Sequence, residues 1–146
     1  MSSPAGAVEV INWSLIGAHN LLNACAAIAA SHHAGVPLAI AARALESFAG
    51  VKRRLELRGT PAGVAVYDDF AHHPTAIALT LEAMRQRVGA DSGRLLAVIE
   101  PRSATMKSGH HQATLVAATA DADEVFWYEP PGLSWPLGEL VAERAG

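Results

Sequence analysis

Residues 64–75 read Val-Ala-Val-Tyr-Asp-Asp-Phe-Ala-His-His-Pro-Thr, and this stretch decides the fold. Its first four residues predict a buried strand, and the periodic apolar segment from Ile77 to Val88 predicts a helix. Two carboxylates and two imidazoles therefore stand between a strand end and a helix start. Ligands of open α/β sheets bind at that position, and a helix N-terminus there favours anionic groups such as phosphate.

The same alternation of strand and helix extends along the chain on both sides of this stretch. Charged and apolar residues alternate before it, and a continuous apolar run, typical of a central parallel strand, follows it. The sequence thus predicts further strands over 53–58, 95–99 and 124–128, and further helices over 112–120 and 137–144. The order βαβαβ predicts an α/β fold with a parallel, Rossmann-like sheet and right-handed crossovers.

The first fifty residues have a different character. Alternating and β-branched residues predict a strand over 8–16, and nearly uniform apolar character predicts a packed helix over 20–33. Gly35 suits the end of that helix, and Pro37 suits the start of a second helix that runs to about Phe48. We expect a domain boundary near 49–52, with one domain over 1–49 and the other over 50–146.

Composition and charge exclude several classes of protein. The net charge of −3, without a basic run or a zinc-finger spacing, gives no support for a nucleic-acid partner. No apolar run is long enough to cross a bilayer, so no membrane partner is expected. The single cysteine, Cys25, cannot form an internal disulfide, which favours a cytoplasmic location.

Four blocks of the sequence resemble the Mur ligases, the ATP-dependent amide-forming enzymes of peptidoglycan synthesis. The blocks keep the family's order and a plausible spacing, and together they cover nearly the whole chain. They are Gly-Ala-His-Asn-Leu-Leu-Asn-Ala at 17–24, Phe-Ala-Gly-Val-Lys-Arg-Arg-Leu-Glu at 48–56, Tyr-Asp-Asp-Phe-Ala-His-His-Pro-Thr at 67–75, and Glu-Pro-Arg-Ser-Ala-Thr-Met-Lys at 100–107.

The resemblance implies the fold, the reaction and the partners. Residues 1–49 would be the end of the central ATPase domain, and residues 50–146 most of the Rossmann-like C-terminal domain. The last two blocks are most similar to a recycling member, which joins UDP-N-acetylmuramate to the tripeptide L-alanyl-γ-D-glutamyl-meso-diaminopimelate. That reaction uses ATP and Mg²⁺ and passes through an acyl phosphate.

The sequence also departs from the family. It contains no G-x-x-x-x-G-K-[ST] phosphate-binding loop, and nothing in it matches the domain that holds the UDP-sugar. We therefore expect a piece of a larger ligase that is inactive alone and carries no catalytic residue of its own. ATP and Mg²⁺ would be bound mainly by the remaining N-terminal and central domains of the same polypeptide.

The resemblance assigns nucleotide contacts to residues that also have plainer interpretations. His19, Asn20 and Asn23 would approach the adenine, although asparagine is also a good helix N-cap. Arg54 would reach the phosphates, because a guanidinium binds phosphate oxygens in pairs, whereas Arg53 is expected to be surface. Asp69 would accept the ribose hydroxyls, although an acid at a strand end can simply stabilise a turn.

The remaining candidates are histidines and the residues of the fourth block. His72 and His73 are expected to donate to phosphate or carboxylate rather than to bind a metal, because adjacent imidazoles point in different directions and no third ligand is spaced nearby. His110 and His111 are expected to be solvated. Peptide-binding residues of the fourth block, on a loop after a buried strand, would be Arg102, Thr105 and Lys107.

Two other functions stay open at this point. The first is the family member that adds L-alanine to UDP-N-acetylmuramate, since it shares the block at 67–75. The second is a nucleotide-binding or interaction module of Rossmann type without ligase chemistry. A Gly-Lys-Thr loop encoded upstream of Val8 would favour a ligase, and a natural start codon close to Val8 would favour the module.

Overall fold

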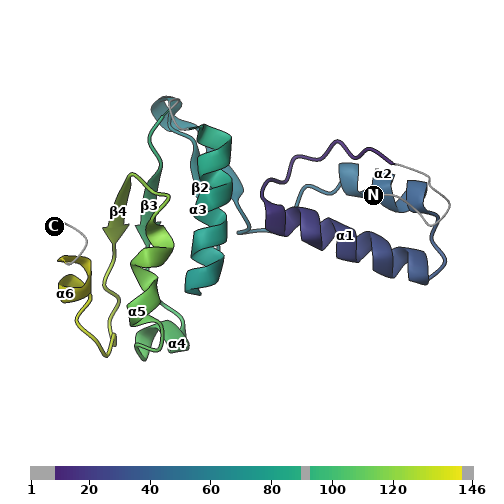
Figure 1. Ribbon diagram of the computed structural model, residues 1–146. Helices are drawn as coiled ribbons and strands as arrows, with labels where there is room; N and C mark the ends of the chain where they lie inside the picture. Colours follow the sequence, from purple (N-terminus) through teal and green to yellow (C-terminus); the bar gives the residue numbers. More distant parts are fainter. Residues whose placement is uncertain (1–8, 90–92, 143–146) are drawn as a thin grey trace. The chain divides into compact units, whose positions relative to one another are not determined.

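A computed structural model describes residues 9–89 and 93–142 of the chain (Figure 1). The chain divides into two compact units, residues 1–52 and residues 53–146, and each is described by itself. The described part contains no helix long and apolar enough to cross a membrane.

The first unit is a helical hairpin, as predicted. Helix α1 covers Ala18–His33 and helix α2 covers Leu38–Glu46, with Pro37 as the α2 N-cap. Gly35 follows the C-cap of α1 with a φ of +90°, a conformation that glycine adopts readily. Mostly small residues are buried in this unit, namely Ala24, Ile28, Ala41 and Ala42.

The strand predicted over 8–16 is wrong for residues 9–16, which are irregular. A strand needs a neighbouring strand for its backbone groups, and the described part of this unit contains none. The segment is held to α2 and the residues after it instead. The Asn12 amide donates to Glu46 Oε1 at 3.3 Å, and the Trp13 indole donates to the Phe48 carbonyl at 2.9 Å.

The second unit alternates strands and helices. In chain order its main elements are β1 (Glu56–Gly59), β2 (Val66–Asp68), α3 (Pro74–Val88), β3 (Leu96–Ile99), α4 (Ala104–Lys107), α5 (Gln112–Leu115), β4 (Glu124–Trp127) and α6 (Leu137–Ala142). Short 3-10 turns, η1 (Pro61–Gly63) and η2 (Ala117–Thr119), lie between them. The strand predicted over 53–58 begins three residues later, at Glu56. The chain bends before it, because Arg53 and Leu55 have positive φ angles of 59° and 48°.

The strands confirm a mixed α/β fold, but they pair differently from the single continuous sheet expected. Strands β3 and β4 form a parallel pair, with Leu96 opposite Glu124 and Ile99 opposite Trp127. Strands β1 and β2 form a separate antiparallel pair. Among the described residues β2 and β3 share no ladder, and the pocket described below lies between them.

One part of the core of the second unit is formed by residues that follow β3. Met106 of α4 and Leu115 of α5 are fully buried, and Trp135 is nearly so. The Trp135 indole donates to the Met106 carbonyl at 2.7 Å, so the tryptophan is held by both packing and a hydrogen bond. This core fixes the position of the loop that carries Arg102 and Lys107.

Candidate functional site

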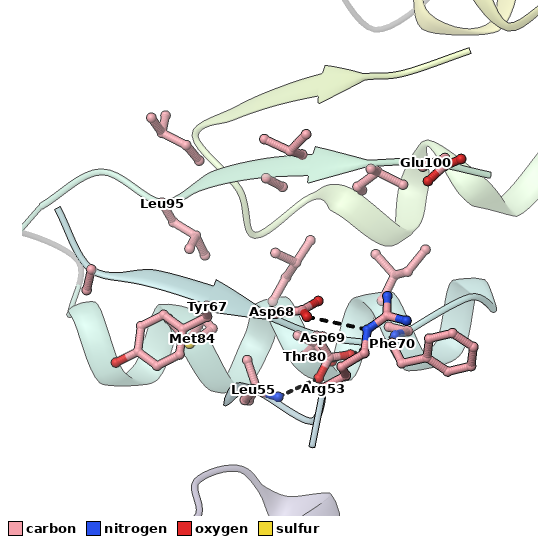
Figure 2. A pocket seen from close by; sticks show the side chains of 18 of the residues that line it. Arg53, Leu55, Tyr67, Asp68, Asp69, Phe70, Thr80, Met84, Leu95 and Glu100 are labelled. Atoms are coloured by element: carbon pink, nitrogen blue, oxygen red, sulfur yellow. Dashed lines mark hydrogen bonds and ion pairs between the residues drawn. The ribbon is translucent and has the colours of Figure 1, made fainter. Parts of the chain in front are cut away.

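A pocket of about 1370 Å³ lies between β2 and β3, and residues of both strands line it. Figure 2 shows the two strands running in the same direction on opposite sides of it. The residues after β2, from Asp69 to His72, line one end, together with Glu100, Arg102 and Ser103 after β3. The crevice predicted from the alternation of strand and helix is therefore present.

Asp69 is the most heavily bonded side chain of this site. Its Oδ2 accepts the Leu55 amide at 2.8 Å, and its Oδ1 accepts the Ala71 amide at 2.7 Å (Figure 2). The Thr80 hydroxyl of α3 donates to Oδ1 at 3.5 Å. The carboxylate thus joins the segment before β1, the loop after β2 and helix α3, so its first role is structural.

Asp68 forms a different set of contacts, with Arg53. Arg53 Nε lies 3.3 Å from Asp68 Oδ2, and its guanidinium carbon lies 4.8 Å from the centre of the Phe70 ring. The His72 ring packs on Phe70 with centroids 5.0 Å apart. Arg53, expected to be surface only, therefore lines the pocket within a stack of cation, benzene ring and imidazole.

The two neighbouring histidines point to different partners, as expected. His72 Nδ1 donates to the Phe70 carbonyl at 2.9 Å, which leaves its Nε2 as an acceptor when the ring is neutral. His73 is the N-cap of α3, and its Nδ1 accepts the Thr75 amide at 3.3 Å. Pro74 at the first helical position lacks the amide that would go unpaired there.

His111, which was expected to be solvated, is only partly exposed. Its ring is half-buried and meets the His73 ring edge to face, with centroids 4.3 Å apart. His110 lies 6.2 Å away on the other side. Burial, and then the charges of His73 and His110, lower the pKa of His111 below its ordinary value. No pattern within His110-His111 itself signals this contact, which depends on how the α4–α5 turn packs.

The loop after β3 is held at several points. Ser103 caps α4 by accepting the Met106 amide at 3.3 Å, and its hydroxyl donates to the His72 carbonyl at 3.5 Å. Lys107 Nζ donates to the Pro131 carbonyl at 2.8 Å. Arg102 and Thr105 are exposed, and the Arg102 side chain has no recorded partner among the described residues. The loop is therefore held in place, and the exposed guanidinium of Arg102 has no partner among the described residues.

Three of the predicted nucleotide residues lie in the first unit. Gly17 is the N-cap of α1, so Asn20 is not the cap that its residue type suggested. The Asn20 side chain donates to the Ile16 carbonyl at 2.7 Å, while Asn23 is exposed. His19 Nδ1 is buried, and residues 9–89 and 93–142 offer it no hydrogen-bond partner.

The structure brings only part of the predicted set together. Asp69, His72 and Arg102 line one pocket, whereas Arg54, His73, Thr105 and Lys107 do not line it. Sequence reasoning missed Phe70, although an aromatic residue directly after two acids at a strand end is a visible signal. No cluster of three or more metal-binding side chains occurs among residues 9–89 and 93–142.

With this geometry described, the chain can be compared with known proteins. The sequence profile described as "Mur ligase, glutamate ligase domain" matches residues 53–144. The chain belongs to the Mur ligase family. The match covers nearly all of the strand-and-helix unit that carries the pocket, which spans residues 53–146.

Two curated relatives of this Mur ligase chain are named UDP-N-acetylmuramate–L-alanyl-γ-D-glutamyl-meso-2,6-diaminoheptandioate ligases. The Escherichia coli relative is 52% identical and the Haemophilus influenzae relative 49% identical, each over 134 residues, or 92% of this chain. The chain spans only 29% of the length of either relative. A UDP-N-acetylmuramate–L-alanine ligase from Streptomyces coelicolor is 42% identical over 96% of this chain and 31% of its own length.

Two solved structures that resemble this chain are also ligases of this family. A murein peptide ligase from Psychrobacter arcticus is 50% identical, has a TM-score of 0.65, and covers 91% of this chain and 27% of its own. A UDP-N-acetylmuramate–alanine ligase from Thermotoga maritima is 25% identical, has a TM-score of 0.71, and covers 99% of this chain and 30% of its own.

Proposed function

We propose that this chain is part of an ATP-dependent ligase that joins UDP-N-acetylmuramate to L-alanyl-γ-D-glutamyl-meso-diaminopimelate in peptidoglycan recycling. The observation that carries the proposal is the identity of about half of all aligned residues with two relatives named for this reaction. The complete enzyme, called the full-length parent below, contains further domains. Within it we assign residues 1–49 to the end of the central ATPase domain and residues 50–146 to the C-terminal domain.

The proposed reaction proceeds in two steps. The muramate carboxylate attacks the γ-phosphate of ATP, giving an acyl phosphate and ADP. The peptide amine then attacks the acyl carbon, an amide bond forms, and inorganic phosphate leaves. Both steps develop negative charge that cationic donors stabilise. Mg²⁺ would supply further charge neutralisation, and we place it mainly on the domains that carry the phosphate-binding loop, which this sequence does not contain.

On the nucleotide side, the residues of this chain bind and orient ATP. Asn23 offers an exposed amide that can pair with the donor and acceptor edge of adenine, and we place His19 and Asn20 of the same helix beside it. Arg54 is exposed and has no recorded partner in the described part of the chain, which leaves its guanidinium available to phosphate.

The second unit adds contacts to the sugar and the phosphates. Asp69 Oδ1 already accepts the Ala71 amide and the Thr80 hydroxyl, but Oδ2 accepts only the Leu55 amide and keeps a lone pair that can accept a ribose hydroxyl. His72 and His73 place imidazole nitrogens near the start of α3, where the helix dipole favours anions. The chain thus supplies positioning and electrostatics, and other domains supply the phosphate-binding loop.

On the peptide side, the loop after β3 captures the carboxylates of the incoming tripeptide. Arg102 is exposed on a loop that Ser103 and Trp135 hold in place, and a guanidinium binds a carboxylate through two hydrogen bonds. Thr105 offers an exposed hydroxyl beside it. Lys107 donates one of its three N–H groups to Pro131, so two remain for a substrate.

The L-alanine ligase is the second candidate, because the Streptomyces relative covers nearly all of this chain. The deciding experiment measures phosphate release by the full-length parent with ATP, Mg²⁺ and UDP-N-acetylmuramate, adding either free L-alanine or the tripeptide. We expect release only with the tripeptide. Release with L-alanine alone would move the protein to the second candidate, and no release in either reaction would favour a non-catalytic nucleotide-binding module.

A further inference from the structure

The segment that follows β2 and the segment that follows β3 are joined by side-chain contacts. The Ser103 hydroxyl donates to the His72 carbonyl at 3.5 Å, so the two loops of the candidate site are hydrogen bonded. One residue further along, the His73 ring meets the His111 ring, with centroids 4.3 Å apart and planes inclined by 69°. Because His111 belongs to the turn between α4 and α5, this turn is in direct contact with the start of α3.

His73 is held at the start of α3 through one ring nitrogen. Its Nδ1 accepts the Thr75 amide at 3.3 Å. A ring nitrogen that accepts an N–H carries no proton, so the proton of the neutral imidazole lies on Nε2. Nε2 is therefore the donor that His73 can offer to an anion beside the helix N-terminus. The direction of this N–H depends on the plane of the ring, which one hydrogen bond at Nδ1 does not fix.

The turn between α4 and α5 holds His111 in place. The His111 carbonyl accepts the Thr114 amide at 3.1 Å and the Thr114 hydroxyl at 3.3 Å. Gly109, two residues before it, has a φ of +79°, and a Cβ there would lie 3.1 Å from Trp135 Cδ1. Trp135 is nearly buried. His111 is therefore part of a tightly packed turn, and its ring is a firm support for a neighbouring side chain.

The surroundings of His111 keep its ring neutral. Burial, and then the charges of His73 and His110, lower the pKa of His111 below its ordinary value of about 6.5. A neutral aromatic ring packs favourably edge to face on another ring, whereas two charged imidazoles would repel each other. His111 does not line the pocket, so its contact with the candidate site passes through His73.

We propose that His111 is a positioning residue of the ligase, which packs on His73 and thereby directs His73 Nε2–H toward the transferred phosphoryl group. The proposal rests on the proposed function, which places a phosphoryl group at the start of α3. His111 itself touches no reacting atom. Its ring fixes the plane of the His73 ring, and the Thr75 amide fixes the position of Nδ1.

Steady-state phosphate release by the full-length parent tests the effect on the reaction. His111→Gln removes the ring and should lower kcat about 5- to 10-fold, as expected for one misdirected hydrogen bond to developing charge. The KM for tripeptide should stay within about twofold, because the peptide-binding residues are unchanged. His111→Phe keeps an aromatic ring against His73 and should restore kcat to within about twofold of the unmodified enzyme.

His110→Gln is the matched control in this measurement. It changes the adjacent histidine, whose ring lies 6.2 Å from that of His111, and it should leave kcat unchanged. The pH profile adds a readout that a merely structural role would not alter. Phenylalanine takes up no proton, so kcat should fall less steeply below about pH 6.5 in His111→Phe than in the unmodified enzyme. This comparison also stands if His111→Gln fails to fold.

Imidazole ¹⁵N spectra of the 146-residue chain test the contact without any ligase activity. Such spectra distinguish the ring nitrogen that carries the proton from the one that does not. At about pH 8, where imidazoles are neutral, His73 should show one tautomer with the proton on Nε2. The same tautomer is expected in His111→Phe and His110→Gln, and a mixture of tautomers in His111→Gln.

Several results would overturn the proposal. They are an unchanged kcat in His111→Gln, equal losses from His111→Gln and His110→Gln, no recovery in His111→Phe, and mixed tautomers of His73 in the unmodified chain. Failure of the proposed function would look different, because the unmodified parent would then release no phosphate with either the tripeptide or L-alanine. In that case His111 has no role in a ligase reaction, whatever the spectra show.

Discussion

At the scale of single residues, the adjacent acids Asp68 and Asp69 have different roles because they contact different partners. Asp68 is the last residue of β2 and Asp69 is the next residue, and the sequence alone offered a turn or a ligand contact for either. Asp69 accepts two backbone amides and the Thr80 hydroxyl, whereas Asp68 makes an ion pair with the partly exposed Arg53. The hydrogen bonds of Asp69 link three segments that are separated in the sequence. The sequence pattern does not show which segments meet in the fold.

The two acids therefore predict unequal effects on stability. Asp69→Asn should lower the free energy of unfolding by about 1–3 kcal/mol, because an amide group would face backbone N–H donors and a charged acceptor would be lost. Asp68→Asn removes only a surface ion pair and should cost about 0–1 kcal/mol. Urea unfolding of the 146-residue chain measures both. Equal costs for the two variants would contradict the structural role of Asp69.

At the scale of elements, the helices were predicted more accurately than the strands. The apolar period and the glycine and proline signals place α1, α2 and α3 within a few residues of their observed ends. Strand pairing depends on partners far away in sequence, so the segment at 9–16 was misassigned and the gap between β2 and β3 was not foreseen. Short α4 was not predicted, because the sequence indicated only a loop after the strand over 95–99.

The turn between α4 and α5 offers a test of local packing. At Gly109, with φ of +79°, an added Cβ would lie 2.6 Å from Gln112 Nε2 and 3.1 Å from Trp135 Cδ1. Gly109→Ala should cost about 2–4 kcal/mol, from backbone strain and displacement of the tryptophan.

Gly132 is the matched control for this turn. Its φ of +80° is nearly the same, but an added Cβ would meet nothing within 4 Å. Gly132→Ala should therefore cost only the backbone strain, about 1–2 kcal/mol. Thermal unfolding of both variants checks the difference. A Gly132→Ala cost equal to that of Gly109→Ala would show that Trp135 packing does not limit the turn.

The contact between this turn and the start of α3 predicts a pH dependence of stability. The folded state lowers the pKa of His111, so below the ordinary value of about 6.5 the unfolded chain takes up a proton before the folded chain does. Stability from this group is therefore complete above that pH and is lost as the pH falls toward the folded-state pKa.

Replacement of His111 checks this sign. His111→Gln should make the free energy of unfolding less dependent on pH just below 6.5, because one differential proton uptake is removed. The measurement is urea unfolding of both proteins at a series of pH values between about 5 and 8. An unchanged slope in the variant would show that the packing of His111 against His73 does not perturb its titration.

At the scale of the whole molecule, two units carry different parts of the proposed function. The hairpin unit contains the adenine candidates His19, Asn20 and Asn23, and the strand-and-helix unit contains the pocket. Family membership and the crevice after β2 followed from sequence motifs. The linking of Asp69, the packing of His111 and the separation of β2 from β3 did not, because each depends on which distant segments contact one another. We propose that the hinge near 49–52 carries the second unit toward the nucleotide during the reaction.

The proposed function assigns two different roles to two arginines. Arg54 binds the nucleotide phosphates, and Arg102 binds the incoming peptide. Steady-state phosphate release by the full-length parent tests this assignment most directly, with ATP and tripeptide varied in turn. Arg102→Ala should raise the KM for tripeptide about 10- to 100-fold and leave the KM for ATP within about twofold, as expected for one lost charged hydrogen-bonding group.

Arg54→Ala is the matched variant in the same measurement. It should lower kcat about 100-fold while leaving the KM for tripeptide nearly unchanged, because its guanidinium acts on the phosphoryl group. We expect these two opposite patterns. A rise in the KM for ATP with Arg102→Ala, or the same pattern from both variants, would contradict the roles assigned to the two arginines.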